Sequence, residues 1–151
     1  MNESSATSPV KDAPQSIRVL LIEDSPPDAL LIRGLLATGF TVTHVTDLGT
    51  GITAAHAPFD IVLLDLFLPD SRGLDTFTQF HSLHPELPIL VMSGLDDEHF
   101  AESAVSDGAQ DYLVKGQMDE VLLRRAVRYA MERKRVERAL RDSEADRKST
   151  R

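Results

Sequence analysis

Residues 60–73 read DIVLLDLFLPDSRG, a nearly unbroken apolar run that contains one carboxylate, Asp65. A charged side chain is rarely buried without a partner, so the presence of this acid needs an explanation. A continuous apolar run is typical of a strand that is covered on both faces of a sheet. Asp65 is therefore predicted to lie where this strand leaves the core and faces a crevice.

The rest of the chain alternates short apolar runs with segments of helix length. Strands are predicted over residues 17–24, 40–45, 60–65, 88–93 and 111–115. The first helix has a recognisable start, with Ser25 as the N-cap, Pro26 at the first position and Asp28 three residues after the cap. Strands that alternate with helices form right-handed βαβ units. The predicted fold class is α/β, a doubly wound sheet of five parallel strands with helices on both faces.

Composition and charge exclude several kinds of protein. The 151 residues contain no cysteine, which removes disulfides and thiolate chemistry and fits a cytoplasmic location. No apolar run is long enough to span a membrane, and residues 1–15, without the apolar core of a secretory signal, are interpreted as a disordered leader. Residues 1–120 have a net charge of −14 and residues 121–151 a net charge of +6. An acidic body argues against general nucleic-acid binding and favours a cation site.

Polar side chains follow four of the five predicted strands. Glu23 and Asp24 end the first strand, Asp65 ends the third, Ser93 the fourth and Lys115 the fifth. In sheets of this kind, ligands bind beyond the carboxyl ends of the strands. Carboxylates that lie close together need a cation, and oxygen ligands suit Mg²⁺. A carboxylate is also a possible nucleophile toward phosphorus, with a metal ion and an ammonium group neutralising the phosphoryl oxygens.

In this order, these residues resemble the receiver domain of two-component response regulators. The matching motifs are the pair Glu23 and Asp24, Asp65 followed by LFLPDSRG, Ser93 after PILVM, and GAQDYLVK ending at Lys115. The spacings from Asp24 through Asp65 and Ser93 to Lys115 are 41, 28 and 22 residues. The resemblance covers about residues 17–130 and implies a flavodoxin-like (βα)5 fold, with a receiver domain over residues 16–131.

The resemblance also implies a role for each residue of the site. Asp65 is expected to be the phosphoacceptor, with a histidine kinase or phosphotransfer protein as donor. The expected cofactor is Mg²⁺, bound by Glu23, Asp24, Asp65 and the backbone carbonyl of Phe67. Lys115 is expected to contact the phosphoryl group, Ser93 to be the switch hydroxyl, and Tyr112 to be the aromatic residue that changes rotamer.

The chain departs from the family pattern at two places. Most members have a proline after the lysine, often with a cis peptide bond, whereas Gly116 follows Lys115 here. A cis bond to a non-proline residue costs about 2.5–4 kcal/mol, so we expect either a trans bond with a changed loop or a strained cis bond. In the family, the positions two after the phosphoacceptor and two after the switch residue tune hydrolysis. Phe67 and Leu95 occupy them and cannot orient a water, so we hypothesise a long-lived phosphorylated state.

Two other functions compete with the switch. An aspartate-nucleophile phosphatase would resemble Asp-x-Asp at its nucleophile, but Phe67 occupies the second position, so no turnover of an external substrate is expected. A receiver-like interaction module that works without phosphorylation is the other alternative, which the complete set of acids makes less favoured.

The C-terminal segment from residue 119 is predicted to be a long helix. A stripe of residues that alternates steps of four and three runs along it: Leu122, Ala126, Tyr129, Arg133, Val136, Leu140 and Ser143. The first half of the helix should pack on the sheet. Residues 132–151 are a predicted extension, either a parallel coiled coil in a dimer or a solvated helix. We expect a homodimer that uses this helix and the face formed by residues 97–108 and 111–115.

Overall fold

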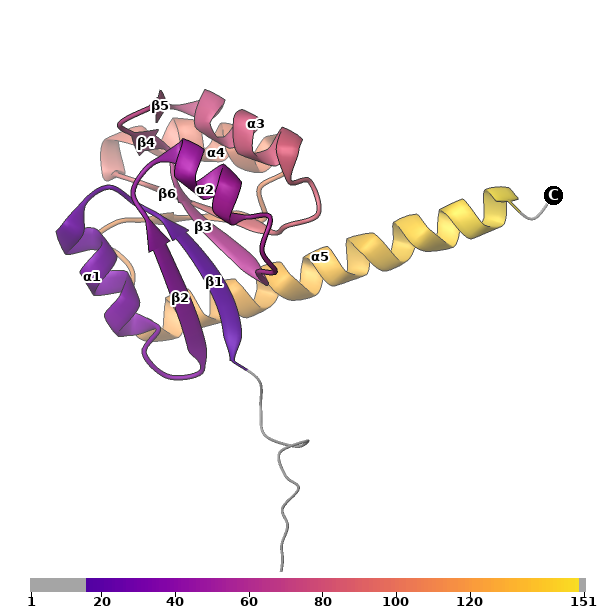
Figure 1. The fold of residues 1–151 in the computed structure, drawn as a ribbon, viewed down its shortest axis with the longest axis horizontal. Helices are drawn as coiled ribbons and strands as arrows, with labels where there is room; N and C mark the ends of the chain where they lie inside the picture. The colour runs from indigo at the N-terminus through magenta and orange to yellow at the C-terminus, as the bar shows by residue number, and fades with distance from the viewer. Residues whose placement is uncertain (1–15, 150–151) are drawn as a thin grey trace, which may run out of the picture.

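The computed structural model describes residues 16–149, and the predicted leader lies outside them. A five-stranded parallel sheet forms the centre of the molecule (Figure 1). Its strands are β1 (Ile17–Ile22), β2 (Phe40–Val45), β3 (Ile61–Asp65), β6 (Ile89–Ser93) and β7 (Asp111–Val114), in the spatial order β2-β1-β3-β6-β7. The chain first moves outward from β1 to β2 and then back across β1 to β3. This reversal places a crevice beyond the carboxyl ends of β1 and β3.

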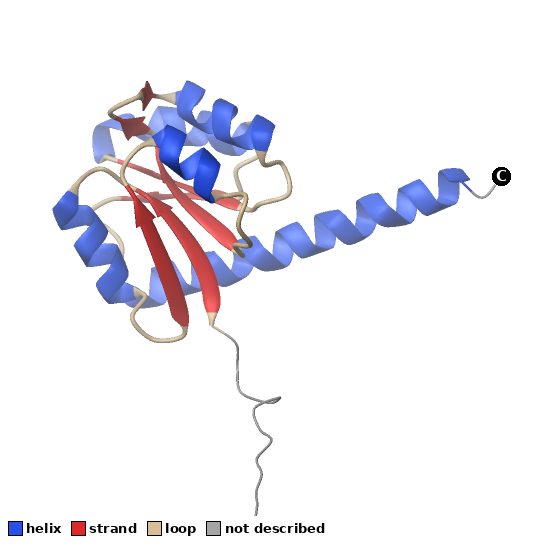
Figure 2. Ribbon diagram, viewed as in Figure 1, coloured by secondary structure: helices blue, strands red, loops and turns tan. Residues whose placement is uncertain are grey.

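The helices cover both faces of the sheet (Figure 2). They are α1 (Pro26–Leu35), α2 (Leu48–Ala54), α3 (Leu74–Leu83), α4 (Glu98–Ser106) and α5 (Glu120–Ser149). Alternate residues of β1 separate the two cores, because Val19 and Leu21 face α1 and α5 while Leu20 and Ile22 face α2, α3 and α4. The predicted doubly wound α/β fold is confirmed. Among the described helices, none combines the length and the apolar character needed to cross a membrane.

A small antiparallel hairpin follows β3 and was not predicted. It pairs β4 (Phe67–Leu68) with β5 (Ser71–Arg72). The Leu66 carbonyl accepts hydrogen bonds from the Thr76 hydroxyl at 2.9 Å and the Gly73 amide at 2.8 Å, which closes the hairpin onto α3. The Asp70 carboxylate in its turn accepts from the first two amides of α2, each at 2.9 Å. The segment that follows Asp65 is therefore fixed to two helices.

Helix α5 has two apolar faces. Leu123, Ala126, Val127 and Ala130 are buried against the sheet, which confirms that the first half of the helix packs there. The predicted stripe lies mainly on the other face, since Tyr129 is 58 % exposed, Val136 50 % and Leu140 59 %. Ala126 is the member of the stripe that is instead buried in its own domain. The second half of α5 extends away from the sheet (Figure 1).

Candidate functional site

The predicted acids meet at the carboxyl edge of the sheet. Strands β1 and β3 pair in parallel with Ile22 opposite Leu64, so the next residues, Glu23 and Asp65, end side by side. One carboxylate oxygen from each of Glu23, Asp24 and Asp65 lies within 4.8 Å of the others. Glu23 and Asp65 are buried, whereas Asp24 is exposed. The cluster therefore has a closed floor and one open side.

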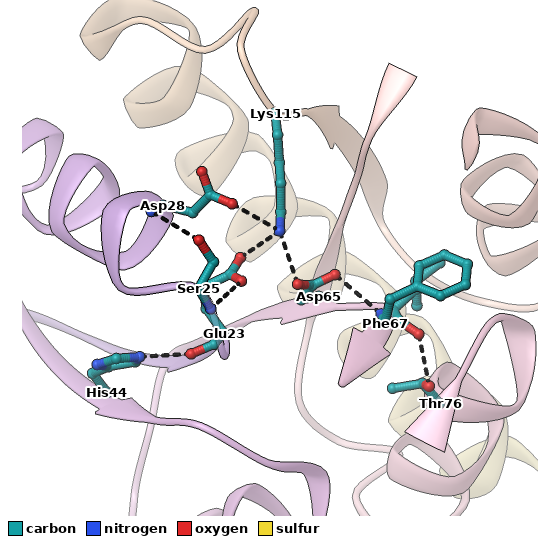
Figure 3. A network of polar contacts seen from close by, with 9 residues as sticks. Glu23, Ser25, Asp28, His44, Asp65, Phe67, Thr76 and Lys115 are labelled. Carbon is teal, nitrogen blue, oxygen red and sulfur yellow. Dashed lines mark hydrogen bonds and ion pairs between the residues drawn. The ribbon is translucent and has the colours of Figure 1, made fainter. Parts of the chain in front are cut away.

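Lys115 supplies the positive charge of the site (Figure 3). Its Nζ lies 2.8 Å from Asp65 Oδ2 and 2.8 Å from Glu23 Oε2. A third carboxylate, Asp28, lies 3.2 Å from the same nitrogen. The Lys115 amide also donates to the Ser93 carbonyl at 2.8 Å, which continues the pairing of β6 with β7. The lysine thus joins the ends of three strands and the first turn of α1.

The peptide bond between Lys115 and Gly116 is trans, as are all the peptide bonds of the described chain. Gly116 has a φ of +89°, a conformation that favours glycine over other residues. Of the two expected peptide bonds, the structure has the trans bond. Lys115 nevertheless reaches Asp65, so the absence of a following proline does not displace the ammonium group.

The electrostatics of the cluster depend on the proton of Glu23. Burial and, to a lesser extent, the neighbouring Asp65 carboxylate raise the pKa of Glu23, and with the opposing effect of Lys115 the pKa is about 7. Burial acts to lower the pKa of Lys115, but its hydrogen bonds to Asp65 and Glu23 outweigh burial and the pKa rises. One ammonium group therefore does not balance this set of acids at neutral pH. A cluster of oxygen ligands with excess negative charge fits a hard cation such as Mg²⁺.

Ser93 and Tyr112 differ in their surroundings. Ser93 is fully buried, and its hydroxyl oxygen has no hydrogen-bond partner within the part of the chain that the structure describes. Tyr112 is half-buried, and its hydroxyl donates to Glu98 Oε2, at the first residue of α4, over 3.1 Å. The serine is therefore available for a new hydrogen bond, while the tyrosine is held to α4.

Phe67 and Leu95 lie on the segments that follow β3 and β6. The Phe67 amide donates to Asp65 Oδ1 at 3.1 Å, and its ring packs edge to face on Phe100 of α4, with centroids 5.4 Å apart. Leu95 begins a 3₁₀ turn before α4, and its side chain is 63 % exposed. Neither side chain carries a group that binds water.

Sequence reasoning missed two contacts of the site. Asp28 was identified only as part of a helix start, yet its carboxylate contacts Lys115. His44 was given no role, and its Nε2 forms a 2.7 Å hydrogen bond with the Glu23 carbonyl. A signal for Asp28 was present, because an acid in the first turn of a helix that begins at the site must lie near it.

Comparison with known protein families matches residues 19–128 to the response regulator receiver domain. The chain therefore belongs to the response regulator receiver domain family, whose members act in two-component systems. Such a domain interacts with a kinase.

Two curated relatives illustrate how far the similarity extends. The chain is 39 % identical over 104 residues to the transcriptional regulatory protein QseB of Haemophilus influenzae, covering 66 % of this chain and 46 % of that protein. It is 36 % identical over 112 residues to the cell cycle transcriptional regulator CtrA of Caulobacter vibrioides, covering 72 % and 48 %. The chain thus spans about half the length of these relatives.

Solved structures show the same fold. A receiver domain from Clostridium thermocellum superposes with a TM-score of 0.71 at 25 % identity, covering 80 % of this chain and 98 % of that one. NtrX from Brucella abortus superposes with a TM-score of 0.75 at 26 % identity, covering 85 % of this chain but 30 % of that protein. The similarity to the second structure is therefore limited to one part of it.

Proposed function

We propose that this chain is a phosphorylation-activated switch that accepts a phosphoryl group on Asp65 from a histidine kinase or phosphotransfer protein. The observation that carries the proposal is the position of the Asp65 carboxylate. It ends β3 at the crevice, 2.8 Å from the Lys115 ammonium group and within 4.8 Å of two further carboxylates. This combination of nucleophile, cation and acid pair suits transfer to a carboxylate.

The chemistry assigns a task to each group. An Asp65 oxygen would form a bond to phosphorus while the bond from phosphorus to the donor nitrogen breaks. Lys115 would donate hydrogen bonds to the phosphoryl oxygens and stabilise their charge. The proposed metal ligands are Glu23, Asp24, Asp65 and the backbone carbonyl of Phe67. Bound Mg²⁺ would neutralise charge on the phosphoryl group as it is transferred.

The switch would act through the hydrogen bonds of two side chains. The buried Ser93 hydroxyl lacks a partner in the described structure and would donate to the new phosphoryl group. Movement of that segment would change the surroundings of Tyr112, which now donates to Glu98. Both changes alter the face formed by α4, β7 and α5.

The proposed readout is self-association of two copies through that face and the C-terminal helix. The exposed apolar side chains of α5, including Tyr129, Val136 and Leu140, support this part of the proposal. We take residues 16–131 as the receiver and residues 132–151 as its helical extension. Phe67 and Leu95 support a slow loss of the phosphoryl group, because neither side chain orients a water.

The test is the intact mass of the protein after incubation with Mg²⁺ and a small phosphodonor. One phosphoryl adduct is expected on the wild type and none on Asp65→Asn. The absence of an adduct on the wild type would refute the proposal and favour the phosphorylation-independent interaction module. An adduct on both proteins would show that another residue is modified.

A further inference from the structure

Asp28 contacts the site but has no task in the function proposed above. Its Oδ2 lies 3.2 Å from Lys115 Nζ, and its side chain is 37 % exposed. Asp28 lies in the first turn of α1, where its amide donates to the Ser25 hydroxyl over 3.4 Å. Figure 3 shows Asp28 approaching Lys115 from the helix, on the opposite side of the ammonium group from Asp65. Asp28 therefore lies in the first turn of α1 and also forms an ion pair with Lys115.

We propose that Asp28 is a positioning residue that holds the Lys115 ammonium group in place when Glu23 and Asp65 are engaged elsewhere. In the present structure the lysine has three carboxylate partners. Among the described residues, the acid set with metal-ligand spacing contains Glu23 and Asp65 but not Asp28. Asp28 is the carboxylate partner of Lys115 that remains when the other two serve as metal ligands.

The loop after Lys115 is open on one side. Gly116 has a positive φ, and apart from its two neighbours in the chain no residue of the described structure lies within 4 Å of the place where a side chain would begin. A side chain at position 116 would therefore face open space. A lysine side chain has many rotamers, so its ammonium group needs a fixed partner to stay at one place. Asp28 lies on a helix and provides a partner that does not depend on the loop.

The first experiment measures the reactivity of the Lys115 amine rather than phosphorylation. Each protein is treated with an acetylating reagent with and without Mg²⁺, and mass spectrometry follows the acetylated fraction of the peptide that contains Lys115. The variants are Asp28→Asn, Asp28→Glu and Ser25→Ala. Ser25→Ala is the matched control, because it removes the cap of the same helix and leaves the carboxylate that contacts Lys115.

The expected result is specific to one variant and one condition. Lys115 of the wild type should react slowly with and without Mg²⁺. In Asp28→Asn it should react slowly without Mg²⁺ and roughly threefold faster or more with Mg²⁺, since the remaining carboxylates are then engaged. Asp28→Glu should restore protection, and Ser25→Ala should behave as the wild type.

Three results would overturn the proposal. The first is an acetylation rate of Lys115 in Asp28→Asn with Mg²⁺ that equals the wild-type rate. The second is an increase in Asp28→Asn that is as large without Mg²⁺ as with it. The third is an increase in Ser25→Ala as large as that in Asp28→Asn, which would indicate fraying of α1. The role that Asp28 would have in signalling rests on the proposed function, but the acetylation test does not. A wild type that accepts no phosphoryl group on Asp65 would refute the proposed function, and the acetylation rates would still decide whether Asp28 holds Lys115.

Discussion

Glu23→Gln should change how the stability of the metal-free protein depends on pH. In the unfolded chain the Glu23 carboxyl has an ordinary pKa of 4.5, and burial together with the neighbouring Asp65 raises it to about 7 in the folded protein. Between these values the folded state keeps a proton that the unfolded state has released. The folded state then binds more protons, so the free energy of unfolding falls as the pH rises through this window. The stabilisation is complete below pH 4.5 and is lost by about pH 7.

The size of the effect follows from the two pKa values of Glu23. Their difference corresponds to about 3 kcal/mol. Asp60 and Asp70 have pKa values lowered below 3.8 and therefore contribute only at more acid pH. His81, whose pKa is lowered mainly by burial, acts in the opposite direction near pH 6.5. It is present in the wild type and in Glu23→Gln, so its contribution cancels in the difference.

The assay is urea unfolding followed by circular dichroism at pH 5, 6, 7 and 8 in the presence of EDTA. Glu23→Gln should be close to the wild type at pH 5 and more stable by about 3 kcal/mol at pH 8. Glu102→Gln, on the exposed surface of α4, is the control and should show no such trend. Saturating Mg²⁺ at pH 8 should stabilise the wild type more than Glu23→Gln. A difference between the two proteins that does not change with pH would refute the assignment of the buried proton to Glu23.

Three further predictions concern the switch and its readout. The chain has no cysteine, so Val136→Cys should form a disulfide-linked dimer under mild oxidation if two copies of α5 align in parallel, and Arg141→Cys should not; equal yields would contradict that alignment. Tyr112→Phe removes the hydrogen bond to Glu98 and should lower the free energy of unfolding slightly in urea titrations, whereas no loss would show that the bond is unimportant. Leu95→Gln places an amide that is able to bind water at the hydrolysis-tuning position and should shorten the lifetime of the phosphoryl adduct, measured by intact mass; an unchanged lifetime would remove Leu95 from that role.

The fold was predictable because its signals are local. The buried strands are continuous apolar runs, and the predicted residues 40–45 coincide with β2. The start of α1 was also predictable, since Ser25 accepts the Asp28 amide as an N-cap does. The site residues at the strand ends followed from the parallel sheet alone. Strand ends that share one edge bring their side chains together whatever the intervening sequence.

Side-chain direction was the part that sequence spacing did not determine. Asp28 is an acid in the first turn of a helix, where it is favoured by the helix dipole. Its presence therefore needed no further explanation from the sequence, and its contact with Lys115 was not predicted. Helix α5 is a second example, because two stripes of residues with the same spacing run along it and either could be the buried face. The second stripe, with steps of four, three and four, consists of Leu123, Val127, Ala130 and Lys134. It is the buried stripe, but the charge of Lys134 made it look like a surface stripe in the sequence. The sequence pattern revealed the longer stripe, which lies mainly on the face that the domain leaves exposed.

Strand β7 connects the acid cluster at the carboxyl edge of the sheet with the second half of α5. At its carboxyl end, Lys115 contacts Asp65. Within the strand, the Tyr112 hydroxyl donates to α4 at Glu98. Just before the strand, the buried Gln110 amide donates to Glu137 of α5 over 3.3 Å, beyond the part of the helix that packs on the sheet. A short segment therefore contacts the acid cluster, α4 and the extension, and a displacement of β7 at Lys115 would act on all three because a paired strand moves as a unit.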